Sequence, residues 1–167
     1  MTTAEPPTRG RSPYITAAGF RALEVEAQAL WQRRGEVTRA LAAAAAEGDR
    51  SENAEYIYRK KELREIDRRI RYLQKRLPEL KVVNALPADA QRVFFGAWVT
   101  LEDTTGTEVT YRIVGVDEFA PAKNWISIDS PVARALLKRA LDEEFTVHTP
   151  GGEVRYWVVD VRYEVEG

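Results

Sequence analysis

The sequence contains no cysteine, and it has a single methionine and a single histidine. Without cysteine there can be no disulfide, no thiolate metal site and no cysteine nucleophile, and one histidine alone is no transition-metal ligand set. Long apolar runs are also missing, because the longest, LAAAAA at 41–46, is far shorter than the roughly 20 residues of a membrane-spanning helix. The N-terminus has no hydrophobic signal core. We therefore expect a cytoplasmic protein without a membrane segment.

The charge of the chain is balanced overall but unevenly distributed. The formal net charge is −1, yet residues 1–53 carry 0, residues 54–81 carry +5 and residues 82–167 carry −6. A chain of 167 residues is long enough for one or two domains. The asymmetry therefore suggests two modules that face different partners, although a solvated face would give the same pattern.

Two long segments carry apolar residues spaced alternately by three and four, the pattern of helices that pack along a seam. The seam positions of the first segment are Phe20, Leu23, Ala27, Leu30, Arg34, Val37, Leu41, Ala44 and Gly48. Those of the second are Tyr56, Arg59, Leu63, Ile66, Ile70, Leu73, Leu77 and Leu80. Pairing 44 with 56, 37 with 63 and 20 with 80 keeps a constant sum, as an antiparallel hairpin requires. We therefore predict an antiparallel coiled-coil finger over residues 14–82, with its tip at 48–55.

The segments on both sides of the finger have other patterns. Residues 1–13 are rich in Pro, Gly and Thr and predict a disordered tail. After Pro87 the apolar period changes to two, which is typical of β-strands, with DTTG at 103–106 as a turn. SPVARALLKRA at 130–140 predicts a short helix that opens with Ser and Pro. We predict a small antiparallel sheet with one helix over residues 88–167, and thus an α+β fold.

The tip carries two carboxylates, Asp49 and Glu52, three residues apart at the start of a helix. One interpretation is a capping box, in which Asp49 accepts from the helix backbone and Glu52 reaches back. The other is a pair of hard oxygen ligands for Mg²⁺ near the positive end of a helix. Both stay open. Two carboxylates are too few to hold Mg²⁺ alone, so the other ligands of such a site would come from another molecule.

The second helix adds a row of cations along one face, adjacent to the seam. Its members, called the cationic row below, are Lys60, Arg64, Arg68, Arg71 and Lys75. Local carboxylates could neutralise the row, which would leave only a solvated helix face. A row that leads toward an acidic tip would instead guide a phosphate backbone while the tip presents metal-binding oxygens.

These residues also carry a family resemblance. The run GDRSENAEYIYRKKELREIDRRIRYLQKRL resembles the coiled-coil tip and second helix of the bacterial Gre transcript cleavage factors, and its GreB branch more than its GreA branch. FFGAWV, RIVGVDE and ISIDSPVARALLK resemble the C-terminal domain of that family. The resemblance spans residues 14–165 and leaves only the N-terminal tail outside the family pattern. It implies an FKBP-like fold for the C-terminal domain.

The resemblance implies a transcription elongation factor that binds RNA polymerase and is not itself an enzyme. The finger would enter the secondary channel, where Asp49 and Glu52 help to hold a Mg²⁺ shared with the polymerase and stimulate cleavage of backtracked RNA. Ser51, Asn53 and Tyr56 belong to the same matched tip. The cationic row would contact the extruded 3′ segment of the nascent RNA.

The resemblance also assigns the docking of the C-terminal domain on polymerase, because Asp129, Ser130 and Pro131 match the stretch associated with it. The seam itself favours a monomer, since the intramolecular hairpin already satisfies it.

Two other functions stay open. The finger could occupy the polymerase channel without cleavage, as Gre-like relatives with altered tips do, although the intact D-x-x-E argues against this. The FKBP-like domain could be a prolyl isomerase, whose site would need an aromatic-lined pocket. Aromatic residues at strand spacing are more often core, and the candidates are Trp98, Tyr111, Phe119, Trp125, Tyr156 and Trp157.

Overall fold

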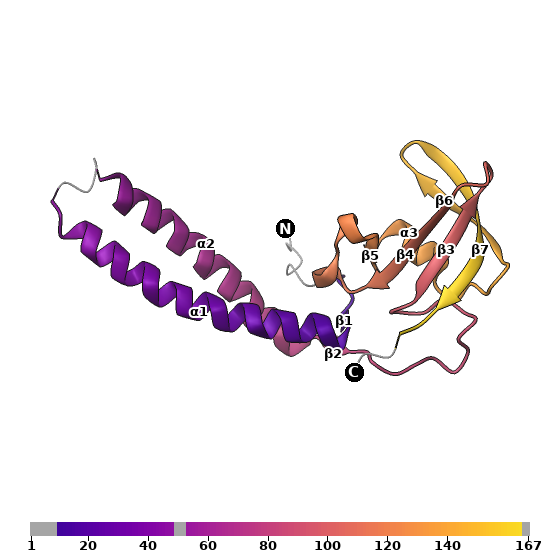
Figure 1. Cartoon of the computed structure of the whole chain (residues 1–167), viewed down its shortest axis with the longest axis horizontal. Helices are drawn as coiled ribbons and strands as arrows, with labels where there is room; N and C mark the ends of the chain where they lie inside the picture. The colour runs from indigo at the N-terminus through magenta and orange to yellow at the C-terminus, as the bar shows by residue number, and fades with distance from the viewer. Residues whose placement is uncertain (1–9, 49–52, 165–167) are drawn as a thin grey trace, which may run out of the picture. The chain divides into compact units, whose positions relative to one another are not determined.

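A computed structural model describes residues 10–48 and 53–164 of the chain (Figure 1). Two long helices come first, α1 over Ala17–Ala45 and α2 over Ala54–Arg76. A β-rich region with one short helix follows. This order, a helical hairpin and then a sheet, confirms the predicted α+β fold.

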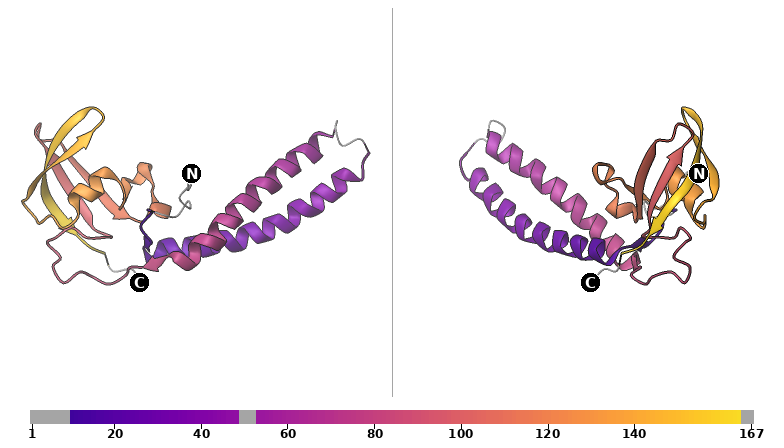
Figure 2. Two further views of the ribbon diagram at one scale, coloured as in Figure 1. Left: turned by 180° about the vertical axis from the view of Figure 1, so that it is seen from behind. Right: turned by 45° about the vertical axis from the view of Figure 1, so that its right-hand side comes forward.

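The helices α1 and α2 lie side by side and run in opposite directions (Figures 1 and 2). Two cross-helix pairs define their register, because Arg33 contacts Glu62 and Glu26 contacts Arg69. Seven residues back on α1 thus correspond to seven residues forward on α2. This is the equal and opposite step that the constant sum of seam positions predicts.

The seam residues face the interior of the hairpin. Their central core cluster consists of Val37, Ile66 and Ile70 with Leu30 and Leu63 packed against them. Every predicted seam position from 20 to 44 and from 56 to 80 is buried or half-buried. Gly48, the last position of the first pattern, is exposed and lies beyond the end of α1. Burial of each large apolar side chain contributes about 1.5–3 kcal/mol, so the seam supplies most of the stability of the hairpin.

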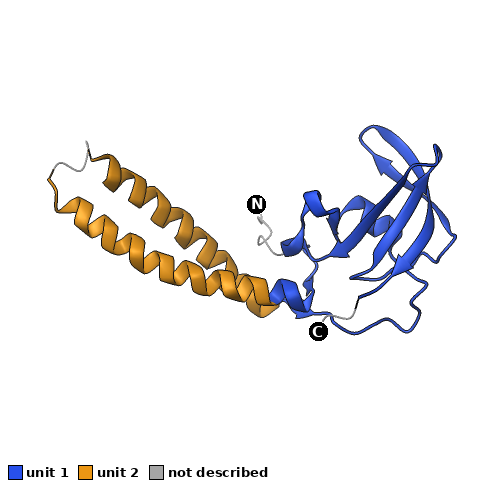
Figure 3. Ribbon diagram, viewed as in Figure 1, with its two compact units in different colours: residues 1–20, 80–167 blue, residues 21–79 orange. Residues whose placement is uncertain are grey.

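The chain separates into two compact units (Figure 3). One is Arg21–Glu79, which holds most of the hairpin, and the other combines Met1–Phe20 with Leu80–Gly167. The first turn of α1 therefore belongs to the same unit as the sheet. The sequence-based prediction places residues 14–20 in the finger instead.

The sheet unit contains five strands in the order β5-β4-β3-β7-β6. Their bounds are Trp98–Asp103 for β3, Glu108–Val114 for β4, Trp125–Ser127 for β5, Glu144–Thr149 for β6 and Gly152–Arg162 for β7. Neighbouring strands are antiparallel except β4 and β5, which pair in parallel. The predicted β3–β4 hairpin is present, and Asp103 holds its turn by accepting from the backbone of Thr105 and Thr107.

One helix, α3 over Pro131–Leu136, packs against β5 and β6. Ser130 is its N-cap and Pro131 its first residue, as the sequence predicts. The core of the unit joins Ala133 and Leu136 of α3 to inward-facing residues of the strands, among them Val99, Leu101 and Val158. Short 3-10 helices occupy Leu77–Glu79, Val116–Glu118 and Pro121–Lys123.

A second, two-stranded sheet was not predicted. It pairs β1, Tyr14–Ile15, in parallel with β2, Lys81–Val82. The residues just before β1 are also held, because the amide of Lys81 donates to the carbonyl of Pro13 at 2.8 Å and Ser12 bonds to Asp129. The prediction of a disordered tail over residues 1–13 is therefore wrong for Ser12 and Pro13, whose contacts come from far along the chain.

The start of α1 is fixed inside the sheet unit. The Thr16 hydroxyl accepts from the amide of Gly19 at 3.0 Å, which makes Thr16 the N-cap. The carboxylate of Glu118 in turn accepts from the amide and the hydroxyl of Thr16 and from the amide of Gly115. A Cβ at Gly19 would overlap this carboxylate, so a larger residue there would force the Glu118 side chain to move.

Candidate nucleic-acid interface on the finger

The two ends of the hairpin tip are joined by one side chain. Asn53 is the N-cap of α2, where its Oδ1 accepts from the amide of Tyr56 at 3.0 Å. Its Nδ2 donates to the carbonyl of Ala44, in the last turn of α1, at 2.7 Å. One amide group thus caps one helix and ties it to the end of the other. The structure gives Asn53 this role within the hairpin, and its predicted part in supporting the acidic tip stays a prediction.

The predicted catalytic residues Asp49 and Glu52, and Ser51 between them, lie outside the described residues. Their roles stay predictions. One alternative can nevertheless be removed, because α2 begins at Ala54 with Asn53 as its cap. The capping-box interpretation of Asp49 and Glu52 is therefore wrong for this helix. The interpretation of Asp49 and Glu52 as oxygen ligands for Mg²⁺ stays a prediction.

Tyr56, the remaining predicted tip residue, is half-buried in the first turn of α2. The ammonium group of Lys60 lies 5.7 Å from the centre of its ring. A cation over an aromatic face is a favourable contact that holds both groups in place. The first member of the cationic row is thus anchored to the tip.

All five residues of the cationic row are exposed. Within residues 10–48 and 53–164, none of them forms an ion pair or a side-chain hydrogen bond. Five cations at intervals of three and four residues, without an ion pair among the described residues, follow one side of α2 from its second turn to its last. Neutralisation of the row by local carboxylates is therefore not seen among the described residues, whereas a solvated face and an RNA contact both stay open.

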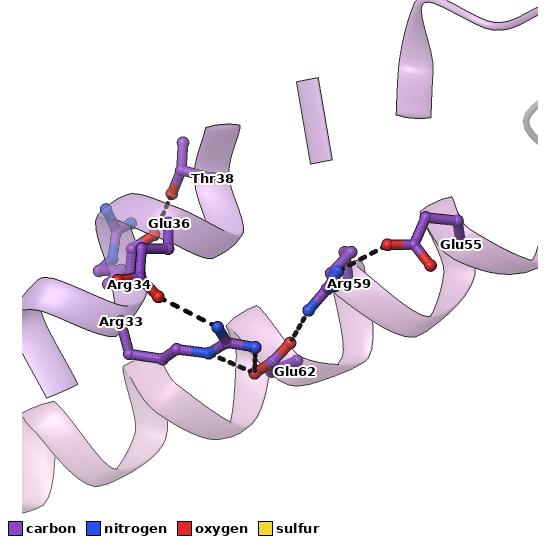
Figure 4. A network of polar contacts seen from close by, with 7 residues as sticks. All are labelled: Arg33, Arg34, Glu36, Thr38, Glu55, Arg59 and Glu62. Carbon is purple, nitrogen blue, oxygen red and sulfur yellow. Dashed lines mark hydrogen bonds and ion pairs between the residues drawn. The ribbon is translucent and has the colours of Figure 1, made fainter. Parts of the chain in front are cut away.

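The opposite flank of the hairpin is different, because its cations are paired (Figure 4). Glu62 bridges both helices, since it accepts from Arg33 of α1 at 2.9 Å and from Arg59 of α2 at 2.9 Å. Arg59 also donates to Glu55. We call this side the paired flank, and it includes Glu26, Arg33, Glu36, Glu55, Arg59, Glu62 and Arg69.

The pairs shift the pKa of their carboxyl groups. Burial raises the pKa of Glu62, but the hydrogen bonds from Arg33 and Arg59 outweigh it and the pKa lies below its ordinary value of 4.5. The hydrogen bond from Arg69 lowers the pKa of Glu26 in the same way, against a smaller effect of burial. Both groups are carboxylates at neutral pH, so the paired flank offers little net charge to a polyanion.

The two arginines that interrupt the seam also find carboxylates. Arg59 contacts Glu55 and Glu62 of its own helix. Arg34 contacts Asp67 at 2.6 Å instead, a partner that the sequence did not suggest. Its position directly after the seam residue Ile66 was the available signal.

In a comparison with known proteins, two family models match two successive parts of the chain. A family model described as "Transcription elongation factor, N-terminal" matches residues 13–82, and one described as "Transcription elongation factor, GreA/GreB, C-term" matches residues 88–163. Transcription elongation factor GreB of Yersinia pestis is 56% identical over 154 residues, which cover 92% of this chain and 90% of the relative. The corresponding protein of Xanthomonas axonopodis pv. citri is 57% identical over 165 residues, 98% of each chain.

The chain belongs to the GreA/GreB family of transcription elongation factors. Its curated relatives at this level of identity carry the name GreB, so it is a GreB-like member. Among solved structures, GreA factor homolog 1 of Thermus thermophilus is 24% identical, with 91% of this chain and 99% of that chain covered at a TM-score of 0.42. No helix in the described ranges has the length and apolarity needed to cross a membrane.

The stretch that the family resemblance assigns to polymerase docking is used within this GreB-like fold. Both carboxylate oxygens of Asp129 accept from Ser12, from its amide at 2.8 Å and from its hydroxyl at 2.5 Å. Ser130 caps α3, and Pro131 is exposed. The structure therefore gives Asp129 and Ser130 roles in their own unit, and their docking role stays a prediction.

The aromatic residues that a prolyl isomerase would need are engaged otherwise in this family member. The guanidinium of Arg112 lies between Trp98 and Trp125, 5.6 Å and 5.2 Å from their ring centres. Arg162 covers Trp98 at 4.7 Å, and Lys123 covers Trp125 at 4.8 Å. Both indoles are thus packed between cations rather than around an apolar pocket, which weakens the isomerase hypothesis.

Proposed function

We propose that the protein binds RNA polymerase, inserts its finger through the secondary channel and stimulates the polymerase to cleave backtracked nascent RNA. The observation that carries this proposal is the one-sided charge of the finger. The cationic row is exposed and has no ion pair among the described residues, whereas the other flank is neutralised by its own carboxylates. A finger of this kind guides a phosphate backbone along one side only.

The tip would complete the reaction centre of the polymerase. Carboxylates are the ligands that Mg²⁺ prefers, and Asp49 and Glu52 are the pair that the finger would deliver. When bound there together with polymerase ligands, Mg²⁺ would activate a water and stabilise the leaving oxygen of the phosphodiester. Asn53 ties the start of α2 to the last turn of α1, so the two helix ends on either side of residues 49–52 are held together. The chemistry belongs to the polymerase, and the finger contributes two oxygens and a path for RNA.

The deciding experiment replaces Asp49 by Asn and Glu52 by Gln, which removes charge while keeping size. Because the cap of α2 is Asn53, these changes leave the described helix start intact. We expect unchanged thermal stability and polymerase affinity, with RNA cleavage in a backtracked elongation complex falling by at least about a hundredfold, since the loss of a charged ligand removes several kcal/mol of transition-state stabilisation.

The matched control is Glu47→Gln, the same chemical change at an exposed residue beyond α1. It should leave cleavage at the level of the unmodified protein. If cleavage survives in the Asp49 and Glu52 variants while binding persists, the finger is a channel-binding regulator without a part in cleavage.

A further inference from the structure

One large aromatic side chain on the finger has no explanation in the hairpin itself. Trp31 of α1 is 51% exposed. In the part of the chain that the structure describes, its ring contacts no cation and no other aromatic ring. The three tyrosines of α2 each contact a cation, Tyr56 with Lys60, Tyr58 with Arg59 and Tyr72 with Arg69, although Tyr58 is itself 59% exposed.

The register of the hairpin places Trp31 beside the cationic row. Arg34 contacts Asp67, which fixes these two residues at one level. Trp31 lies about one turn before Arg34 on α1, and Arg71 lies about one turn after Asp67 on α2. Because the helices are antiparallel, both steps run in the same direction along the finger. Residues three or four apart share a face of a helix, so Trp31 and Arg71 lie at about the same level and on the flank of the Arg34–Asp67 pair.

We infer that Trp31 is a base-stacking residue for the single-stranded RNA that the cationic row guides. The inference rests on the proposed function and adds a contact to the bases, which the row of cations does not provide. Single-strand binding sites combine a charged track for phosphates with aromatic faces on which bases stack, and this stacking tolerates any sequence. Here the exposed indole of Trp31 would supply the aromatic face, and the five exposed cations of the cationic row would supply the charged track.

The position of Trp31 also limits which RNA can reach it. Trp31 precedes the last residue of α1, Ala45, by fourteen residues, which is about 21 Å along the helix axis. An RNA 3′ segment that passes the tip must therefore extend by several nucleotides before a base can stack on the indole. Short backtracked segments should contact the tip and the first cations but not Trp31.

The test compares Trp31→Ala, Trp31→Leu and Trp31→Phe in the full-length protein. The probes are a labelled single-stranded RNA of about 12 nucleotides and an abasic strand of the same length, which keeps the phosphates and lacks the bases. Trp31→Ala and Trp31→Leu should weaken RNA binding about tenfold, while Trp31→Phe stays near the unmodified protein. Binding of the abasic strand should not change in any of the three. Val25→Ala, which alters an exposed apolar residue of the same helix, should bind both probes normally.

Two outcomes separate this inference from the proposed function. If Arg64→Glu with Arg68→Glu weakens binding of both probes but Trp31→Ala weakens neither, Trp31 is not a stacking residue and the RNA track stands. If none of these variants changes binding or cleavage of long backtracked RNA, the RNA track itself fails. A loss of polymerase affinity in Trp31→Ala without RNA present would overturn the inference in favour of a protein contact.

Discussion

The two flanks of the finger both carry cations but differ in whether carboxylates pair with them. On the paired flank, Arg33, Arg59 and Arg69 are each held by a carboxylate on the same or the other helix. On the other flank the cationic row has no such partner among the described residues. Exposed ion pairs contribute little to stability, with a median of about 0–1 kcal/mol. The pairing therefore matters less for holding the hairpin together than for deciding where its positive charge is available.

The largest expected effect comes from reversing the row. Replacing Arg64, Arg68 and Arg71 by Glu should lower the affinity for single-stranded RNA by at least about a hundredfold at low salt, because three phosphate contacts become repulsive. The dependence of log K on log salt should flatten by about 2, since each contact to a single strand contributes about 0.7. Fluorescence anisotropy over a salt series measures both.

The matched control for this reversal exchanges a pair on the other flank, Glu26→Arg together with Arg69→Glu. The net charge and the ion pair are kept, so RNA affinity should stay as it is. A comparable loss of affinity in the exchanged pair would mean that the paired flank also binds RNA, and the difference between the flanks would disappear.

The next effect separates stability from charge. Asn53→Ala removes the cap of α2 and the bond to Ala44 and should cost about 2 kcal/mol of unfolding free energy, about 1 for each. Asn53→Ser keeps a cap and loses the bond, so it should cost about 1 kcal/mol. Urea unfolding measures the two values. RNA affinity should not change in either variant, because neither flank loses a charge; equal costs would show that the bond to Ala44 contributes nothing.

A smaller effect should make the two flanks more alike. Glu62→Gln removes the carboxylate that Arg33 and Arg59 share. Both guanidinium groups then become available to phosphates, and the affinity for single-stranded RNA should rise about two- to threefold at low salt. Glu65→Gln, at an exposed residue of the same helix without a cation partner among the described residues, should raise it less. No rise with Glu62→Gln would mean that pairing does not restrain these arginines.

The smallest effect is on pH dependence. The pKa of Glu26 is lowered in the folded protein by Arg69, so the unfolded chain binds its proton first as pH falls. The pair therefore stabilises the fold fully above the ordinary carboxyl pKa of 4.5, and this stabilisation is lost as pH falls through the lower folded value. Thermal melts from pH 6 to pH 3 should show a slightly steeper loss for the unmodified protein than for Glu26→Gln. Identical slopes would show that the pair is not coupled to folding.

The sequence predicts the hairpin well because its information is local and periodic. A seam with a constant sum of positions predicts equal and opposite steps along the two helices, and the pairs Arg33–Glu62 and Glu26–Arg69 keep such a step. The sequence could not show which residue caps α2, since Asp and Asn are both good N-caps. In the structure the cap is Asn53, which also bonds to Ala44 on the other helix.

Contacts between distant segments were the part that sequence could not provide. The strands β1 and β2 pair although the entire hairpin lies between them in the sequence, and Ser12 bonds to Asp129. Neither contact has a periodic signal in the sequence. The exposure of Trp31 was also hidden, because its position directly after the seam residue Leu30 is compatible with either burial or solvent. Only the side chains on the facing helix decide between the two.

The distribution of tryptophan has a practical consequence for spectroscopy. Trp31 is the one tryptophan on the hairpin, whereas Trp98, Trp125 and Trp157 all lie in the sheet unit. The half-exposed indole of Trp31 is open to a dissolved quencher such as acrylamide, whereas the rings of Trp98 and Trp125 are each covered by two cations. The intrinsic fluorescence of the unlabelled protein should therefore contain a quenchable part that reports the finger and a protected part that reports the sheet unit.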